Sequence, residues 1–304
     1  MSLLVLSAQD VNTIIAALPS AELEAPMASE FRRLSSGSHY ASPQKTSITM
    51  SHHTALFMPS RVEDIGTAIK VVSESGCAEE IVNASAQTAL RSAASSVLAT
   101  RLLLSEPPSS LVAFGAGKQI EAHLDLHIRA FPSLKRCTIV NPSTNARLEN
   151  LLFVLRQSHP LVSLEGLSLD DTTNLRSAVG HANVICTATS STQPPFPLQP
   201  GMVEVDCGLI SRSETIVIDS IEACAIETRE LIAAGLSAGD MTEIGQLVEE
   251  WDCQDGPGEV QMRKGDVTVF KSVGIGLQDV AIARCVVSKA ENLGIGTTVV
   301  DFHT

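Results

Sequence analysis

The sequence has too few basic residues to balance its acidic ones. Its 304 residues carry 21 Lys and Arg against 34 Asp and Glu, which gives a formal net charge of −13 at pH 7. A charge of this sign repels the phosphates of nucleic acids and the anionic surface of membranes over the whole molecule. We therefore expect no nucleic-acid partner.

The seven cysteines form no C-x-x-C pair, and they lie far apart in the chain. An odd, scattered set argues against both a disulfide framework and a zinc knuckle. No apolar run approaches the ~20 residues of a membrane-spanning helix, and Leu3–Leu6 is too short for the apolar part of a signal peptide. No internal repeat or low-complexity tract is present. These absences favour a soluble, cytoplasmic protein with no membrane partner.

The apolar content of the chain is sufficient for a large core. Apolar residues make up 44% of the sequence, and the length favours two domains. From Leu111 onward, short apolar segments alternate with helical patterns, which predicts an α/β fold with a parallel sheet covered on both faces. The predicted strands are 111–114, 137–140, 162–164, 184–187, 203–205, 216–218 and 267–270. Intervening helices include 145–157, and a last helix over about 276–292 is followed by Gly294 as a stop signal.

The first hundred residues follow a different pattern, typical of a smaller mixed α+β domain. The predicted elements are, in order, a strand at Leu3–Leu6, a helix that begins with Ser7 as its cap and Asp10 three residues later, a turn-rich stretch over 34–54, a strand at Ala55–Pro59 and a buried helix over 88–104. The pair Pro107-Pro108 ends this last helix.

A glycine-spaced turn, Gly115-Ala116-Gly117, follows the predicted strand 111–114 and precedes a helical pattern. This is the context of the dinucleotide fingerprint, in which a helix N-terminus offers free N–H groups to a pyrophosphate and a side chain at either glycine would block its approach. Ile120 departs from the pattern, because a third Gly or Ala usually stands there. The alternative is an ordinary tight turn.

The end of the next strand bears on which dinucleotide would bind. A carboxylate there accepts hydrogen bonds from the ribose of NAD and repels the additional phosphate of NADP. In this sequence Asn141 is neutral, Ser143 and Thr144 can donate to a phosphate, and Arg147 could neutralise it. The pattern favours NADP(H), with NAD(H) as the alternative. Arg147 could instead be a solvated helix residue.

Five separated motifs occur together in one order. They are Leu56–Pro59, Thr88–Ala94, Phe114–Gln119, Thr187–Ser191 and Phe270–Asp279. In order and spacing they resemble the ornithine cyclodeaminase/mu-crystallin family. The resemblance implies a Rossmann-type domain, expected at 105–275, and a substrate and dimerisation domain at 1–104 that is completed by the C-terminal helix in 276–304. It also implies a homodimer.

The resemblance extends to individual residues. Lys70 matches the family's active-site lysine, and Arg91 matches the arginine close to cofactor and substrate. Arg offers a planar fork to a carboxylate, and a partly desolvated Lys can exchange a proton. Lys45 and Val273 are the further substrate-binding candidates. The implied cofactor-binding residues are Arg91, Gly115, Ala116, Gly117, Lys118, Gln119, Asn141, Ser143, Thr144, Arg147, Thr187 and Ser272.

Two departures from the family's pattern decide between its activities. Only residues 71–87 separate Lys70 from Thr88, so the substrate domain is trimmed. In the family, the aspartate used in cyclodeamination comes after the glycine that Gly208 matches. The short loop 206–215 has no aspartate after Gly208, and Asp206 comes before it, so that aspartate has no counterpart here.

Reducing a preformed imine needs only a bound nicotinamide, a cationic anchor and a proton source. We therefore expect an NAD(P)H-dependent oxidoreductase acting on the C=N bond of a ketimine or imino acid, or the reverse amino-acid dehydrogenation. The alternatives are an ornithine cyclodeaminase and a noncatalytic NADP-dependent binding protein like mu-crystallin.

The histidines supply no convincing further site. His123 and His127 are spaced i, i+4 on one predicted helix and could in principle bind a metal. With no third ligand in sight, we expect them to be partly exposed helix residues, and we expect no metal centre. His52-His53 could enter the cleft or belong to a loop.

Overall fold

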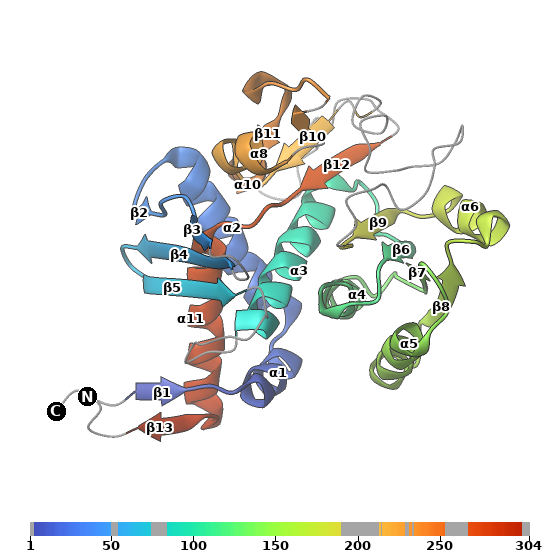
Figure 1. Ribbon diagram of the computed structural model, residues 1–304, viewed down its shortest axis with the longest axis horizontal. Helices are drawn as coiled ribbons and strands as arrows, with labels where there is room; N and C mark the ends of the chain where they lie inside the picture. Colours follow the sequence, from blue (N-terminus) through green and yellow to red (C-terminus); the bar gives the residue numbers. More distant parts are fainter. Residues whose placement is uncertain are drawn as a thin grey trace.

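The computed structural model describes residues 3–49, 54–73, 84–189, 213, 215–228, 231–232, 234–252 and 267–299. Two α/β parts lie side by side, and a central helix, α3 (Ala84–Leu103), contacts both (Figure 1). The predicted α/β fold class is confirmed. The predicted division into domains at residues 104 and 276 stays a prediction.

The N-terminal part is built on an antiparallel sheet. Its strands are β2 (Tyr40–Ala41), β3 (Thr46–Thr49), β4 (Thr54–Val62) and β5 (Gly66–Ser73), in the order β2-β4-β3 with β5 also paired to β4. The C-terminal helix α11 (Gly276–Leu293) and α3 pack against this sheet, and α1 (Ala8–Ala17) and α2 (Ser20–Ser36) pack against those two helices. The C-terminal helix therefore completes this part, as the resemblance implied.

The two ends of the described chain meet at this part. Strand β1 (Leu3–Val5) pairs in antiparallel fashion with β13 (Thr297–Val299) below α11 (Figure 1). The signals that begin and end the flanking helices are those read in the sequence: Ser7 and Asp10 form a capping box at α1, and Gly294, with φ 65°, ends α11 in the left-handed conformation.

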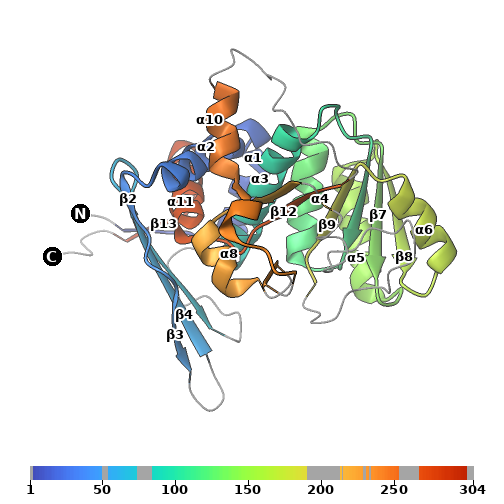
Figure 2. The ribbon, with the colours of Figure 1, turned by 90° about the horizontal axis from the view of Figure 1, so that it is seen from above.

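The other part holds a four-stranded parallel sheet. Its elements are β6 (Ser110–Phe114), α4 (Lys118–Ala130), β7 (Arg136–Asn141), α5 (Ala146–Ser158), β8 (Ser163–Ser168), α6 (Thr172–Gly180) and β9 (Val184–Thr187), with strand order β8-β7-β6-β9. Helices α4 and α5 cover one face and α6 lies on the other (Figure 2). The sequence pattern therefore predicted all four strands of this sheet, at 111–114, 137–140, 162–164 and 184–187.

A second parallel sheet follows in the chain. It consists of β10 (Thr215–Ile218), β11 (Thr242–Glu243) and β12 (Thr268–Lys271) in the order β11-β10-β12, with α8 (Ile221–Glu227), a short 3-10 helix at Ala238–Asp240 and α10 (Ile244–Asp252). The predicted strand 203–205 lies outside the described residues. Because β10 and β12 are parallel, their carboxyl ends meet at one edge, directly before α11.

Helix α3 is rich in alanine, which lets other helices approach it closely. Ala93, Ala94 and Val97 are fully buried, and α3 packs against α2, α4 and α11. Its contact with α4 also explains an error in the sequence reading. His127 is 0% exposed and His123 is buried as well, so neither is the partly exposed residue that was expected.

The ring nitrogens of His123 and His127 have hydrogen-bond partners on both α3 and α4. Each Nδ1 donates to a carbonyl one turn earlier, that of Gln119 or His123, at 2.7 Å. Each Nε2 lies within hydrogen-bond distance of a hydroxyl on α3, that of Ser96 at 3.0 Å or that of Thr100 at 3.1 Å. Burial of the rings disfavours their charged form. Burial lowers the pKa of His123, and it lowers the pKa of His127 to about 3.

Acid should therefore destabilise the fold through these rings. Below a pH of about 6.5 a histidine in the unfolded chain takes up a proton, whereas His127 stays neutral until about pH 3. Stability is then lost as the pH falls through this window, by at most ~1.4 kcal/mol per pH unit for each histidine. Urea unfolding at several pH values should show a shallower slope for His127→Asn, but the wild-type slope for the exposed control His181→Asn. Equal slopes in all three proteins would contradict this assignment.

Candidate active site

The glycine turn stands at the carboxyl end of β6. Gly115 has φ 111°, and a Cβ there would come within 3.0 Å of the Ala188 carbonyl oxygen, so the position requires glycine. Gly117 is the N-cap of α4 and provides no side chain to cap it. The first amides of α4 therefore suit an anionic group such as a pyrophosphate.

The end of β7 lies next to this turn. Asn141 is buried, and its Nδ2 donates to the Ser143 carbonyl at 2.9 Å. Asn145 caps α5 by accepting from the amides of Arg147 and Leu148. The Arg147 Nε in turn donates to the Ala116 carbonyl at 3.0 Å.

The Arg147 guanidinium thus lies over the glycine turn, and its Nη2 is 3.1 Å from the position that a Cβ of Gly117 would take. Arg147 is exposed and makes this contact with the turn, and its role in cofactor binding stays a prediction. The remaining candidates at this edge are placed around it: Ser143, Thr144 and Lys118 are exposed, Gln119 is half-buried, and Thr187 is exposed at the end of β9, paired with Phe114.

A buried ion cluster occupies the contact between β5, α3 and α11. Lys70 on β5 lies with its Nζ 3.4 Å from Oδ2 of Asp279, and the Nε of Arg91 on α3 lies 2.8 Å from Oδ1. All three side chains are less than a tenth exposed. Within these three groups, one carboxylate faces two cations.

Two amide side chains hold this cluster in place. The Arg91 Nη1 donates to Oε1 of Gln278 at 2.7 Å, and the Nε2 of Gln278 donates to the Ser95 hydroxyl at 3.0 Å. The Nε2 of Gln87 donates to the backbone carbonyl of Asp279 at 2.8 Å. No partner for the Arg91 Nη2 is found within the described part of the chain, so its two N–H groups are available to a ligand.

The turn between β12 and α11 lies against Arg91. A Cβ on Gly274, which has φ 77°, would overlap the Arg91 guanidinium, so only glycine permits this contact. Ser272 and Val273 of the same turn are partly buried. The structure therefore brings together Lys70, Arg91 and this turn, as the sequence motifs suggested.

Lys45 is the candidate that the structure places elsewhere. Its Nζ pairs with the Glu227 carboxylate on α8 at 2.5 Å, and the neighbouring Gln44 donates to Glu222 on the same helix. Lys45 thus anchors the loop before β3 to α8. It stays a prediction that this side chain also binds substrate.

Sequence reasoning missed the acidic and amide members of the cluster. Asp279 and Gln278 lie in the last of the five motifs, but nothing local shows that they meet Lys70 or Arg91. Asp206 and His52-His53 lie outside the described residues. Within the described ranges, no group of three His, Cys, Asp or Glu side chains could hold a metal ion.

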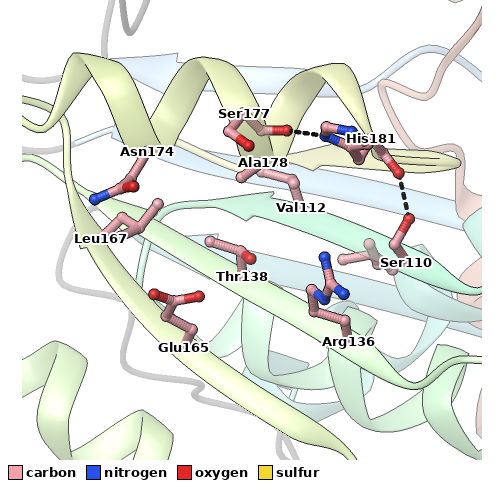
Figure 3. A pocket seen from close by; sticks show the side chains of 11 residues that line it. Ser110, Val112, Arg136, Thr138, Glu165, Leu167, Asn174, Ser177, Ala178 and His181 are labelled. Atoms are coloured by element: carbon pink, nitrogen blue, oxygen red, sulfur yellow. Dashed lines mark hydrogen bonds between the residues drawn. The ribbon is translucent and has the colours of Figure 1, made fainter.

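A separate hollow of about 130 Å³ lies under α6, at the amino ends of β6 and β7 (Figure 3). Arg136, Thr138 and Glu165 reach it from the sheet, and His181 from the end of α6. Open α/β sheets bind their ligands at the carboxyl ends of the strands. We therefore place the candidate site at the glycine turn and not in this hollow.

Comparison with known proteins agrees with this geometry. The family model described as ornithine cyclodeaminase/mu-crystallin family matches residues 61–205, a range that contains Lys70, Arg91 and the glycine turn. A Delta(1)-pyrroline-2-carboxylate reductase of Bacillus cereus is 25% identical over 300 residues, covering 84% of this chain and 87% of the relative. Over residues 61–205 the chain is similar to the ornithine cyclodeaminase/mu-crystallin family.

Two further proteins extend the similarity. An iminosuccinate reductase of Paracoccus denitrificans is 28% identical over 250 residues, covering 74% of this chain and 71% of the relative. The solved Delta(1)-pyrroline-2-carboxylate reductase of Thermococcus litoralis, in complex with NADH and L-proline, has a TM-score of 0.78 at 20% identity and covers 98% of this chain and 100% of its own. This last likeness establishes the shared fold.

Proposed function

We propose that this protein is an NAD(P)H-dependent oxidoreductase that reduces the C=N bond of an imino acid. The observation that carries the proposal is the buried Lys70–Asp279–Arg91 cluster beside the Ser272–Gly274 turn. It offers a cationic anchor for one carboxylate and an ammonium group that can donate a proton. Relatives named as reductases of two imino acids support the same reaction type.

The chain's own residues would divide the work as follows. Arg91 holds the substrate carboxylate through the N–H groups that Asp279 and Gln278 leave available. Lys70 keeps the imine nitrogen protonated, which makes its carbon a better hydride acceptor. A dinucleotide held by its pyrophosphate at the glycine turn would supply that hydride from its nicotinamide. Asp279 lies close enough to stabilise the ammonium form of Lys70.

The cofactor is a nicotinamide dinucleotide, and we propose that NADPH is preferred. Asn141, rather than a carboxylate, ends β7, and Arg147 lies over the glycine turn with its guanidinium fixed by Ala116. A 2′-phosphate placed there gains a charge-assisted hydrogen bond and meets no repelling carboxylate among these residues. Ser143 and Thr144 add exposed hydroxyl donors.

Removing the Arg147 guanidinium tests this preference. Arg147→Ala should weaken NADPH binding ~10-fold or more, because a hydrogen bond to a charged group is worth roughly 1.5–3 kcal/mol. NADH has no 2′-phosphate, so its affinity serves as the internal control and should change little. Calorimetric titration of both cofactors measures the two affinities. A variant that loses NADH and NADPH affinity equally would show that Arg147 only supports the turn.

We also propose a homodimer formed through the outer face of the antiparallel sheet. On β5, Lys70 points inward, opposite the buried Met58, so the neighbouring Ile69 faces outward and is 60% exposed. Interaction surfaces bury apolar side chains, and Ile69 would supply one to the proposed interface. Light scattering on Ile69→Glu, which should shift the protein towards monomer, checks this assignment.

A direct assay tests the proposed function. The purified protein is mixed with NADPH or NADH and Δ1-pyrroline-2-carboxylate, and the loss of the reduced cofactor is followed by its absorbance. We expect consumption that depends on the imine. Cofactor binding without consumption would instead indicate a binding protein, and ammonia released from ornithine would indicate a cyclodeaminase. Either result would overturn the proposal.

A further inference from the structure

A buried carboxylate outside the ion cluster lies at the carboxyl end of β10. Asp219 follows Ile218 directly and is 0% exposed. Its backbone N–H donates to the Lys271 carbonyl at 3.2 Å, which places it beside the last residue of β12. A buried charge is costly unless hydrogen bonds compensate it, so its partners indicate what it holds.

The two carboxylate oxygens of Asp219 have different partners. Oδ2 accepts from the Ser272 hydroxyl and from the Gly274 amide, both at 2.7 Å. Oδ1 accepts from the Ser220 amide at 2.9 Å and from the Cys224 thiol at 3.5 Å. One oxygen therefore grips the β12–α11 turn, and the other anchors Asp219 to the start of α8.

The turn that Asp219 grips determines where Arg91 lies. Gly274 is so close to the guanidinium that a Cβ would overlap it, while Gln278 holds Arg91 through a hydrogen bond and Asp279 through an ion pair. The guanidinium is thus enclosed between the turn and the first residues of α11. If the turn moved, Arg91 would lose one wall of its site.

Asp219 also decides how Ser272 can bind a ligand. The Ser272 hydroxyl has one proton and donates it to Asp219, so towards a ligand the oxygen can only accept. A carboxamide N–H2 group, such as that of a nicotinamide, is the matching donor. A phosphate or carboxylate oxygen at Ser272 would find no proton.

We infer that Asp219 is a positioning residue for the imine-reducing site: it holds the Ser272–Gly274 turn against Arg91 and orients the Ser272 hydroxyl as an acceptor. This inference rests on the proposed function. It concerns a residue that touches neither substrate nor the ion cluster directly and acts through the turn.

The isosteric variant Asp219→Asn tests the inference sharply. The Gly274 and Ser220 partners are backbone N–H groups that can only donate, and they approach opposite oxygens. An asparagine presents one oxygen and one N–H2 group, so in either orientation an N–H2 group faces a backbone N–H. The turn must shift, and a misplacement of about 1 Å at a site of this kind costs up to ~100-fold in rate.

We expect Asp219→Asn to raise the KM for Δ1-pyrroline-2-carboxylate ~10-fold or more, with a smaller change in the NADPH dissociation constant. Assays are run well below the unfolding midpoint of the variant. A folded variant with wild-type KM would overturn the inference while leaving the proposed function intact. A wild-type protein that neither consumes NADPH with the imine nor binds L-proline with NADP⁺ in a calorimeter would instead remove the proposed function.

A second pair of variants decides the matter should Asp219→Asn fail to fold. Ser272→Ala removes a donor to the oxygen that grips the turn, whereas Cys224→Ala removes a donor to the other oxygen. Burial and the adjacent Asp219 raise the pKa of the Cys224 thiol, so it is a neutral donor there. Ser272→Ala should raise the imine KM several-fold and Cys224→Ala should leave it unchanged. The reverse order would contradict the inference.

Discussion

Replacing Lys70 with alanine should lower kcat for imine reduction about 10²–10⁴-fold, the range found when a positioned general acid is removed. Lys70 is the buried ammonium group of the ion cluster and lies 3.4 Å from Asp279. Without it the imine nitrogen must be protonated by water, and the carbon becomes a poorer hydride acceptor. Steady-state kinetics with NADPH and Δ1-pyrroline-2-carboxylate measures the effect.

A matched control separates this role from the loss of any lysine. Lys289 lies on α11, and its Nζ is 3.6 Å from the Glu22 carboxylate, away from the ion cluster. Lys289→Ala should keep turnover within about twofold, as expected for a surface ion pair. Thermal unfolding of both variants shows whether the fold survives. Undiminished kcat in a folded Lys70→Ala protein would remove Lys70 from the mechanism.

Arg91→Lys should reduce kcat/KM ~100-fold, mainly through a higher KM for the imino acid. The substitution keeps the charge but removes the planar fork, which here bonds Asp279 through Nε and Gln278 through Nη1. A lysine cannot make both contacts and also hold a carboxylate in a bidentate arrangement. Truncating one member of a buried charged pair typically costs 2–5 kcal/mol, which is consistent with an effect of this order.

The control for this substitution lies on the same helix. Arg101 of α3 pairs with Glu24 and lies over the Phe131 ring, well away from the Gly274 turn. Arg101→Lys should change stability modestly and leave KM unaltered. If Arg91→Lys retained the wild-type KM, substrate binding through the guanidinium would have to be abandoned.

The segment after Lys70 and the loop 206–215 are both shorter here than in the ornithine cyclodeaminase/mu-crystallin family. The lost aspartate of the cyclodeamination loop and the trimmed segment after Lys70 both involve residues outside the described ranges. Within those ranges, Asp279 is a carboxylate that contacts Lys70, and it also pairs with Arg91. Lys70 and Arg91 compensate the charge of the Asp279 carboxylate. A carboxylate paired in this way is better suited to stabilising Lys70 as a proton donor than to binding the amine of a substrate.

Local signals in the sequence predicted much of the fold. The capping pair Ser7 and Asp10, the terminal Gly294 and the alternation of strands and helices after Leu111 depend on residues close together in the chain. Helix α2 was missed, because Pro26 lies inside it and its polar residues mask the apolar face. Residues 34–36 at the end of this helix were read as loop for the same reason.

The sequence by itself determined the glycine turn, the neutral end of β7 and the presence of Lys70 and Arg91, because each is a residue type within a recognisable local motif. Only the tertiary structure decided that Asp279 and Gln278 surround Arg91, that Asp219 grips the Gly274 turn, that Lys45 pairs with Glu227 and that His127 is buried. These contacts join residues that are distant in sequence, or depend on which helix face meets α3. Neither periodicity nor spacing along the chain contains that information.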